Sequence, residues 1–277
     1  MSDIKTTVRQ LFNQLANDYE KKAWLTYEVG QRLLERLDYM RIAPQKVLDL
    51  GSGSGQFGEA VAARYPDADV VAVDLAEKLL QQNKVAACVA DAECLPFASQ
   101  QFDLVFANLS LPWSFAPDAM LLEMQRVLKP GGLILFSSLG PDTLKQLNQA
   151  VAATLSFKAQ PFFSDMHDLG DMMVKAKLAD PVVDMEMLQL GYQDLNKLIT
   201  EVEAEGLGLF FGDSLSALEE SEVWQRFCEN YHKQDDYYPL SYEIIYGHAW
   251  GSQVSNTAGI NDNGEVSIAI SSLRRKP

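Results

Sequence analysis

The sequence has few of the features that mark a secreted, metal-binding or membrane-spanning protein. Its 277 residues include three cysteines, Cys88, Cys94 and Cys228, an odd number without the close spacing of a metal motif. No uninterrupted apolar run reaches the roughly 18 residues of a membrane-spanning helix. The N-terminal stretch is charged throughout and has no apolar signal-peptide core. We therefore expect a cytoplasmic protein without a disulfide framework, a metal site or a membrane span.

Positive charge is also scarce. The chain has 23 Lys and Arg residues against 38 Asp and Glu residues, a formal net charge of −15. A chain this acidic is repelled by nucleic-acid phosphates and by anionic lipid. We expect no nucleic-acid partner and no membrane partner, while the 47% hydrophobic content is enough for a full core.

The sequence does show a regular alternation of strand-like and helix-like segments. Short apolar segments rich in β-branched or aromatic residues predict strands over 46–50, 69–75, 85–90, 102–109 and 132–139. The segments between them predict helices over 55–65, 76–84, 117–128 and 141–157. Strands that alternate with helices and are apolar on both faces indicate an α/β fold with a mostly parallel sheet between helical layers.

The two ends of the chain differ from this central part. Residues 7–37 predict one or two amphipathic helices, and residues 193–233 predict a largely helical, acidic region between extended segments over 181–192 and 240–250. The expected organisation is N-terminal lid helices over 1–40, a cofactor-binding core over 41–192, a helical lid insertion over 193–239, and a final strand with its tail over 240–277.

A glycine-rich loop, "VLDLGSGSGQFG" over 47–58, follows the first expected strand. Glycines let a ligand approach the backbone closely, and open parallel sheets bind ligands at the carboxyl ends of their strands. Two interpretations compete. Gly53, Gly55 and Gly58 satisfy the G-x-G-x-x-G fingerprint of dinucleotide-binding proteins. Alternatively, Asp49 and Gly51 belong with them to the loop of a class I S-adenosylmethionine-dependent methyltransferase.

Acidic residues at the next two strand ends favour the second interpretation. Asp74 ends the second strand, where its two oxygens can accept both hydroxyls of a ribose, and Asp91 follows the third strand, near the expected adenine. Each acid alone is also typical of a helix cap or a loop, but three acids around one crevice favour a ligand. The expected residues at the S-adenosylmethionine site are Asp49, Gly51, Gly53, Gly55, Asp74, Leu75, Asp91, Ala92 and Asn108.

Several longer stretches resemble one family, the malonyl-[acyl-carrier protein] O-methyltransferases of biotin synthesis. They are "LFNQLANDYEKKA" (11–23), "FDLVFANLSLPW" (102–113), "FSSLGPDTLKQLNQA" (136–150), "FSDMHDLGDMMVKAKLADPVVDME" (163–186) and "YPLSYEIIYGHAW" (238–250). The resemblance implies a seven-stranded, Rossmann-like sheet. It also implies methyl transfer from S-adenosylmethionine to the free carboxylate of a malonyl thioester on acyl-carrier protein, or on coenzyme A.

The resemblance also implies what the site needs. A carboxylate acceptor is already ionised at neutral pH, so positioning and the exclusion of water matter more than a general base. Tyr19 is the candidate lid residue, or an interfacial core tyrosine. Asn108 lines the crevice, or forms a turn. Lys145 and His167 are the candidate donors to the substrate carboxylate, although Lys145 is equally typical of a solvated helix face and His167 of a helix cap.

Two alternative functions remain open at this stage. The chain could act on another acceptor, as do the related assembly factors of respiratory complexes, which modify a protein arginine and share "GPDTL"-like and "DLGD"-like stretches. It could also bind the cofactor without transferring a methyl group. "YGHAW" and "MHDLGD" favour the biotin family, and the intact "GSGSG" loop with Asp74, Asp91 and Asn108 favours an active enzyme.

Overall fold

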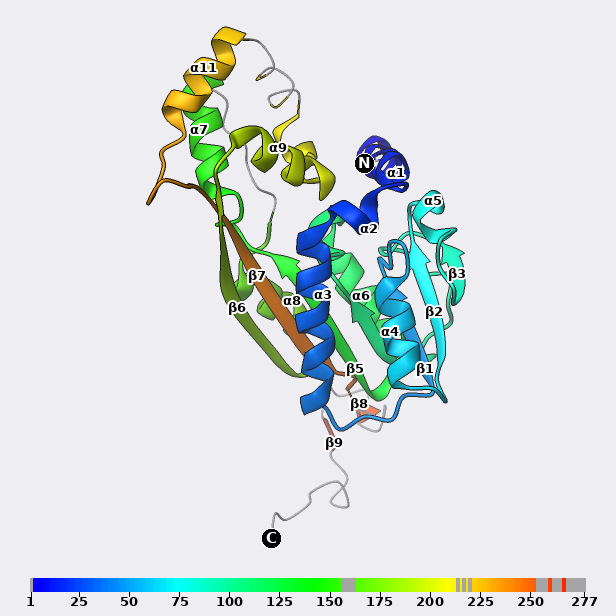
Figure 1. Ribbon diagram of the computed structural model, residues 1–277. Coiled ribbons are helices and arrows are strands. Elements are labelled where there is room, and N and C mark those ends of the chain that lie inside the picture. The colour runs from blue at the N-terminus through cyan, green and yellow to red at the C-terminus, as the bar shows by residue number, and fades with distance from the viewer. Residues whose placement is uncertain are drawn as a thin grey trace.

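The centre of the molecule is a seven-stranded sheet with the order β3-β2-β1-β4-β5-β7-β6 (Figure 1). A computed structural model describes residues 2–155, 163–212, 215, 218, 221–252, 259–260 and 266–267. The strands are β1 (Lys46–Leu50), β2 (Asp69–Asp74), β3 (Ala86–Val89), β4 (Phe102–Ala107), β5 (Leu128–Leu139), β6 (Ala179–Tyr192) and β7 (Tyr238–Trp250). The pairs among β1 to β5 are parallel, whereas β7 runs antiparallel to both of its neighbours, β5 and β6. The predicted mostly parallel sheet is confirmed.

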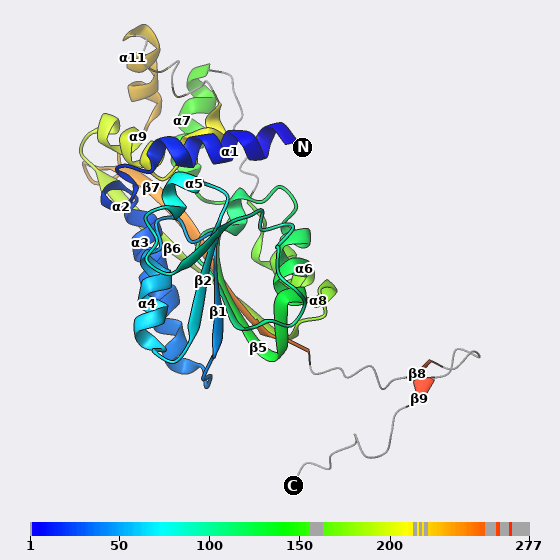
Figure 2. The ribbon, with the colours of Figure 1, turned by 90° about the vertical axis from the view of Figure 1, so that its right-hand side faces the viewer.

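Helices cover both faces of this sheet. Helices α3 (Trp24–Arg36) and α4 (Gln56–Arg64) lie on one face, and α6 (Pro117–Val127) and α8 (Met166–Lys175) lie on the other (Figure 2). The central strands are apolar on both sides for this reason: all of β1 after Lys46 is buried, and so is nearly all of β4. Alternate residues of these strands belong to two separate cores, one under each helical layer.

The N-terminal forty residues divide into two parts. Helices α1 (Ser2–Leu15) and α2 (Tyr19–Lys22) lie at the carboxyl end of the parallel strands, in the upper part of Figure 1. Val8 and Phe12 of α1 pack beside Leu79 of the short helix α5 (Glu77–Leu80). Helix α3 instead buries Val29 and Leu33 completely in the main core. Helix α3 is therefore part of the main core, whereas α1 and α2 pack in a separate, smaller cluster at the strand ends.

The last third of the chain adds helices at the same end of the sheet. They are α7 (Lys145–Leu155), α9 (Leu195–Ala204), the 3-10 helix η3 (Leu207–Phe211) and α11 (Ser221–Asn230). Two further 3-10 turns, η1 (Leu37–Tyr39) and η2 (Leu111–Trp113), and a two-stranded pair, β8 (Gly259–Ile260) with β9 (Val266–Ser267), complete the described elements. The region predicted to be helical over 193–239 thus contains α9, η3 and α11 and returns to the sheet at Tyr238.

Two predicted helices have different bounds in the structure. The helix predicted from residue 141 begins at Lys145, because Leu144 has a φ of +58° and its N–H donates to the carbonyl of Ser241 on β7 (2.7 Å). Its predicted end at 157 lies outside the described residues. The helix predicted over 76–84 is only α5, and the Asn83 side chain beyond it donates to the carbonyl of Gly53 (3.0 Å).

Candidate functional site

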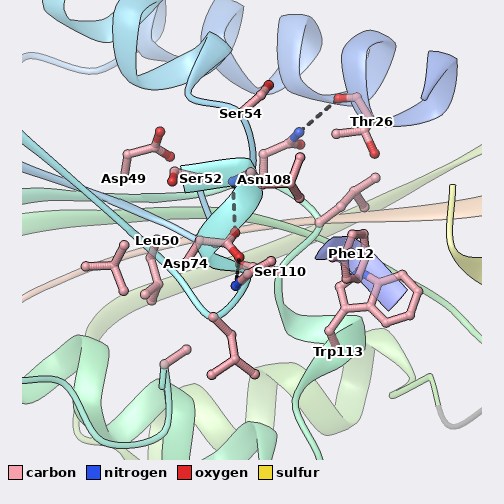
Figure 3. Close-up of a pocket in the computed structure, with 18 of the residues that line it drawn as sticks. Phe12, Thr26, Asp49, Leu50, Ser52, Ser54, Asp74, Asn108, Ser110 and Trp113 are labelled. Atoms are coloured by element: carbon pink, nitrogen blue, oxygen red, sulfur yellow. Dashed lines mark hydrogen bonds between the residues drawn. The ribbon is translucent and has the colours of Figure 1, made fainter. Parts of the chain in front are cut away.

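A pocket of about 1180 Å³, open mouth included, lies where β1, β2 and β4 end (Figure 3). The order of the sheet reverses between β1 and β4, and such a switch point is where open α/β sheets bind ligands. The pocket is lined by most of the residues expected from the sequence, which are Tyr19, Asp49, Gly51, Gly53, Asp74, Leu75, Asp91, Ala92 and Asn108. The strand ends therefore meet as predicted.

Asp49, in β1, is the most deeply buried acid of the pocket. Only 2% of Asp49 is exposed, and Oδ2 of its carboxylate is buried without a hydrogen-bond partner, although the N–H of Gly58 nearby favours the charged form. Burial, and then the neighbouring charge of Asp74, raise the pKa of Asp49 to about 7. A buried carboxylate with an unpaired oxygen favours a positively charged ligand.

Asp74, at the end of β2, holds the glycine loop in place. Its Oδ2 accepts from the N–H of Gly53 (2.9 Å) and its Oδ1 from the N–H of Ala76 (2.7 Å), as the dashed lines of Figure 3 show. Burial raises the pKa of Asp74, and these backbone N–H groups oppose that rise. Because a carboxylate oxygen can accept more than one hydrogen bond, both oxygens can still accept from a ligand.

The glycines of the loop serve different purposes. Gly51 and Gly53 line the pocket with φ angles of +68° and +55°, a conformation that glycine adopts readily. A Cβ at Gly51 would also lie 2.3 Å from the Cβ of Ser110. Gly55 is not among the lining residues: a Cβ there would lie 2.1 Å from Oδ1 of Asn83, so this glycine permits close packing beneath the loop.

Two serine hydroxyls resemble Oδ2 of Asp49 in lacking a hydrogen-bond partner. The Oγ atoms of Ser52 and Ser110 are buried without a hydrogen-bond partner, and both residues line the pocket. Buried polar atoms are normally paired, so unpaired ones that gather in one pocket indicate a ligand that pairs them. The donors and acceptors present suit a ligand with an amino-acid end better than an apolar one.

Tyr19, Thr26 and Asn108 form the wall of the pocket on the side of α3. The hydroxyl of Tyr19 lies 3.1 Å from Oγ1 of Thr26, and the amide nitrogen of Asn108 donates to the carbonyl of Thr26 (2.9 Å; Figure 3). Burial raises the pKa of Tyr19 strongly, so its hydroxyl is neutral and is no base. Thr26 joins the two predicted residues and was not predicted itself.

The amide of Asn108 has both of its ends occupied. Its Oδ1 accepts from the hydroxyl of Ser137 in β5 (2.8 Å), which in turn accepts from the N–H of Leu109 (2.8 Å). Leu109 has a φ of +46°, an uncommon conformation for a non-glycine residue and one that occurs at functional sites. Asn108 lines the pocket, but its polar atoms fix α3 against the sheet.

Helix α1 lies across the pocket and contributes a cation. The Lys5 ammonium lies 2.6 Å from Oδ2 of Asp91 and also pairs with Glu93. Phe12 meets Trp113 edge-on with ring centroids 4.8 Å apart, and Trp113 stacks on Phe210 of η3 at 5.3 Å. Three distant parts of the chain therefore meet over the pocket. Lys5 and Phe12 lie on the same face of the amphipathic helix. This shared face is the one sequence pattern that could have predicted Lys5 as a residue of the pocket.

Lys145 and His167 are not brought to the pocket. Lys145 is exposed at the start of α7 and pairs with Asp142 (3.2 Å). His167 is exposed in the first turn of α8, where its backbone N–H donates to Oδ1 of Asp165 (2.7 Å). The cations that line the pocket are instead Lys5 and Arg9.

The described part of the chain shows neither of two other kinds of feature. Within it, no group of three or more His, Cys, Asp or Glu side chains is placed to hold a metal ion. Its helices include none with the length and apolar character needed to cross a membrane.

Comparison with solved structures shows the fold. YcgJ from Bacillus subtilis matches 81% of this chain and 99% of its own, with a TM-score of 0.58 and 15% identity. Phosphoethanolamine N-methyltransferase 2 from Haemonchus contortus, solved with S-adenosyl-L-methionine, matches 81% of this chain and 52% of its own, with a TM-score of 0.52 and 18% identity.

Comparison of sequences shows the family. Residues 48–136 match the family described as "Methyltransferase domain". The malonyl-[acyl-carrier protein] O-methyltransferase of Gallionella capsiferriformans (strain ES-2) is 40% identical over 89% of this chain and 90% of its own. The protein of the same name from Legionella pneumophila is 35% identical over 99% of both chains. The chain belongs to the malonyl-[acyl-carrier protein] O-methyltransferase family.

Proposed function

We propose that this protein is a cytoplasmic enzyme that transfers a methyl group from S-adenosylmethionine to the free carboxylate of malonyl-acyl-carrier protein. The product is a methyl ester. Because methylation removes the negative charge of the carboxylate, the malonyl group can serve as a primer for pimeloyl synthesis on the way to biotin. The relatives at 35–40% identity support this reaction and its partner. The structural observation that carries it is the buried, unpaired oxygen of Asp49 in the pocket at the switch point of the sheet.

The residues present fit S-adenosylmethionine. This cofactor carries an ammonium and a sulfonium, and when bound it supplies an electrophilic methyl group. Asp49 would hold the ammonium, because its unpaired oxygen needs a cation. Asp74 would hold the ribose diol beside Leu75, and Asp91 with Ala92 would hold the adenine. The other loop residues would lie against the cofactor's amino-acid end through backbone atoms and serine hydroxyls.

The protein's own contribution to the reaction is positioning and cover. The acceptor carboxylate is ionised at neutral pH and needs no base, which agrees with a neutral Tyr19. The aromatic wall of Phe12 and Trp113 excludes water from one side of the pocket. Loss of water around a carboxylate strengthens its attack on a cationic centre.

Arg9 is our candidate partner for the substrate carboxylate, in place of Lys145 and His167. It is an exposed residue of α1, one turn after Lys5 on the same side of the helix, and it lines the pocket. Lys5 is already paired with two acids. Throughout the described ranges no ion pair involves Arg9, so its guanidinium is available to an anionic substrate.

Replacement of Arg9 tests this assignment. We expect Arg9→Ala to raise the Michaelis constant for malonyl-acyl-carrier protein by about tenfold or more, the scale of a hydrogen bond to a charged group, without changing the affinity for the cofactor. Lys21→Ala, on the exposed surface of α2, removes the same charge and serves as the matched control. An unchanged Michaelis constant in Arg9→Ala would remove this residue from the substrate site.

The proposed reaction is tested by intact-mass spectrometry of malonyl-acyl-carrier protein after incubation with the protein and S-adenosylmethionine. We expect the addition of one methyl group, and none with acetyl-acyl-carrier protein. Malonyl-coenzyme A in parallel shows which thioester is preferred. No methylation despite tight cofactor binding would contradict the proposal and favour another acceptor, such as a protein arginine, or a role without transfer.

A further inference from the structure

Glu205 is a buried carboxylate that lies outside the pocket, in the turn after α9. The residue is 6% exposed. It accepts three hydrogen bonds from the first turn of α3: from the N–H of Leu25 to Oε1 (2.5 Å), from the N–H of Thr26 to Oε2 (3.3 Å), and from the hydroxyl of Thr26 to Oε2 (2.8 Å). The insertion of the last third of the chain is thus anchored to the helix that carries one wall of the pocket.

The hydrogen bonds to Glu205 determine which partner donates in the hydrogen bond between Thr26 and Tyr19. An ionised carboxylate only accepts, so the single hydroxyl proton of Thr26 is directed to Glu205. Oγ1 of Thr26 can then only accept from the hydroxyl of Tyr19, 3.1 Å away. Tyr19 therefore donates its single hydroxyl proton to Thr26. Toward the pocket, the Tyr19 oxygen can then act only as a hydrogen-bond acceptor. The Tyr19 ring lies close to the loop, 3.8 Å from where a Cβ of Gly53 would stand.

We propose that Glu205 is a positioning residue which, through Thr26, keeps the Tyr19 oxygen a hydrogen-bond acceptor toward the cationic ligand of the pocket. This inference rests on the proposed function in one respect, that the ligand is the cation S-adenosylmethionine. A simple helix cap would require only the two backbone N–H groups. The third bond, to the Thr26 side chain, links the cap to Tyr19.

The protonation state of Glu205 decides the direction of the chain of hydrogen bonds. A protonated Glu205 donates to Oγ1 of Thr26, which then donates to Tyr19, so that the Tyr19 proton is free to face the pocket. Burial raises the pKa of Glu205 to about 7, against its hydrogen bonds to Thr26 and Leu25. The titratable groups that face it are Glu201 of α9, Tyr192 of β6, Tyr242 of β7 and Tyr19 of α2. Above about pH 7, where Glu205 is mostly ionised, the Tyr19 oxygen is therefore a hydrogen-bond acceptor toward the pocket.

A double-mutant cycle on the full-length protein tests the link. At pH 8, with affinity for S-adenosylmethionine measured by calorimetry, we expect Glu205→Gln and Tyr19→Phe each to weaken binding by about three- to tenfold, the scale of one hydrogen bond. The double variant should bind no more weakly than Tyr19→Phe alone, because Glu205 acts only through the Tyr19 hydroxyl. A purely structural cap predicts that the two losses add, and additive losses would overturn the proposal.

Three further variants make the test specific. Glu201→Gln removes a charge one turn earlier, where the partner is the hydroxyl of Tyr192 (2.6 Å), and should leave the affinity unchanged. Thr26→Ser keeps the hydroxyl and should bind normally, whereas Thr26→Val should bind like Tyr19→Phe and tests the link even if Glu205→Gln fails to fold. Normal binding by Thr26→Val would overturn the proposal. Binding without methyl transfer by the unaltered protein would contradict only the proposed function, whereas no binding would contradict both.

Discussion

Asp49 and Glu205 represent two regions of the molecule, the strand ends of the sheet and the helices that the last third of the chain adds beside them. Both are buried carboxylates, and burial raises the pKa of each to about 7. They differ in how their oxygens are used. Glu205 has both oxygens bonded within the protein, whereas Asp49 leaves Oδ2 without a partner. A raised pKa therefore reports burial in both regions, and only the unpaired oxygen distinguishes a ligand site from an internal support.

The same contrast extends to the neighbours of each carboxylate. At the strand ends, the hydroxyls of Ser52 and Ser110 are also unpaired. Near Glu205, contacts are satisfied internally: its carboxylate accepts from the hydroxyl of Thr26, and Phe210 of η3 stacks on Trp113. The strand ends leave polar atoms available to a ligand, whereas the turn after α9 uses the oxygens of its buried carboxylate within the protein.

The largest expected effect that separates the two regions comes from Asp49→Asn. We expect it to weaken S-adenosylmethionine binding by roughly 10- to 100-fold, the scale of a hydrogen bond to a charged group. The ligand-free protein should unfold at higher urea, because a buried, partly unpaired charge is removed while the acceptor for the Gly58 N–H is kept. Calorimetry and urea unfolding at pH 8 measure the two quantities. A weaker fold together with unchanged affinity would place Asp49 among the internal supports.

A smaller effect is expected from pH. Cofactor binding should lower the pKa of Asp49 by placing an ammonium beside it, so that a proton is released near pH 7 and affinity falls by up to about tenfold per pH unit below that. Calorimetry in phosphate and in Tris, whose ionisation enthalpies differ, counts the released protons. Asp49→Asn should lose most of this dependence. If the variant kept all of it, the dependence would belong to another group.

The smallest effect is on the stability of the ligand-free protein, where the two carboxyls should behave alike. Each has a folded-state pKa above its unfolded value, so its contribution is fully present below about pH 4 and is lost as the pH rises through 7. Relative to the unaltered protein, Asp49→Asn and Glu205→Gln should each gain about 1 kcal/mol of unfolding free energy between pH 6 and 7.5. Urea unfolding across this range gives the differences. If the unfolding free energies of variant and unaltered protein differed by the same amount at every pH, this prediction would be contradicted.

The parts of the site that lie at strand ends could be predicted from the sequence, because they depend on local pattern. Asp74 follows an apolar strand, and parallel topology brings its end beside that of β1. The start of α7 could not be predicted, because the bond from Leu144 to Ser241 depends on the far strand β7. Thr26 and Glu205 are 179 residues apart, so no pattern in either segment indicates that they meet.

The ion pair between Lys5 and Asp91 has a consequence for how a ligand enters. A ligand that needs the Asp91 carboxylate competes with the ammonium of the protein's own first helix. For a ligand that must take the place of Lys5 at Oδ2 of Asp91, we expect helix α1 to act as an internal competitor. The observed affinity equals the intrinsic affinity multiplied by the fraction of molecules in which the competitor is released. Any solution condition that weakens this one ion pair, such as higher ionic strength, should therefore tighten the binding of the nucleoside end while it loosens the cover.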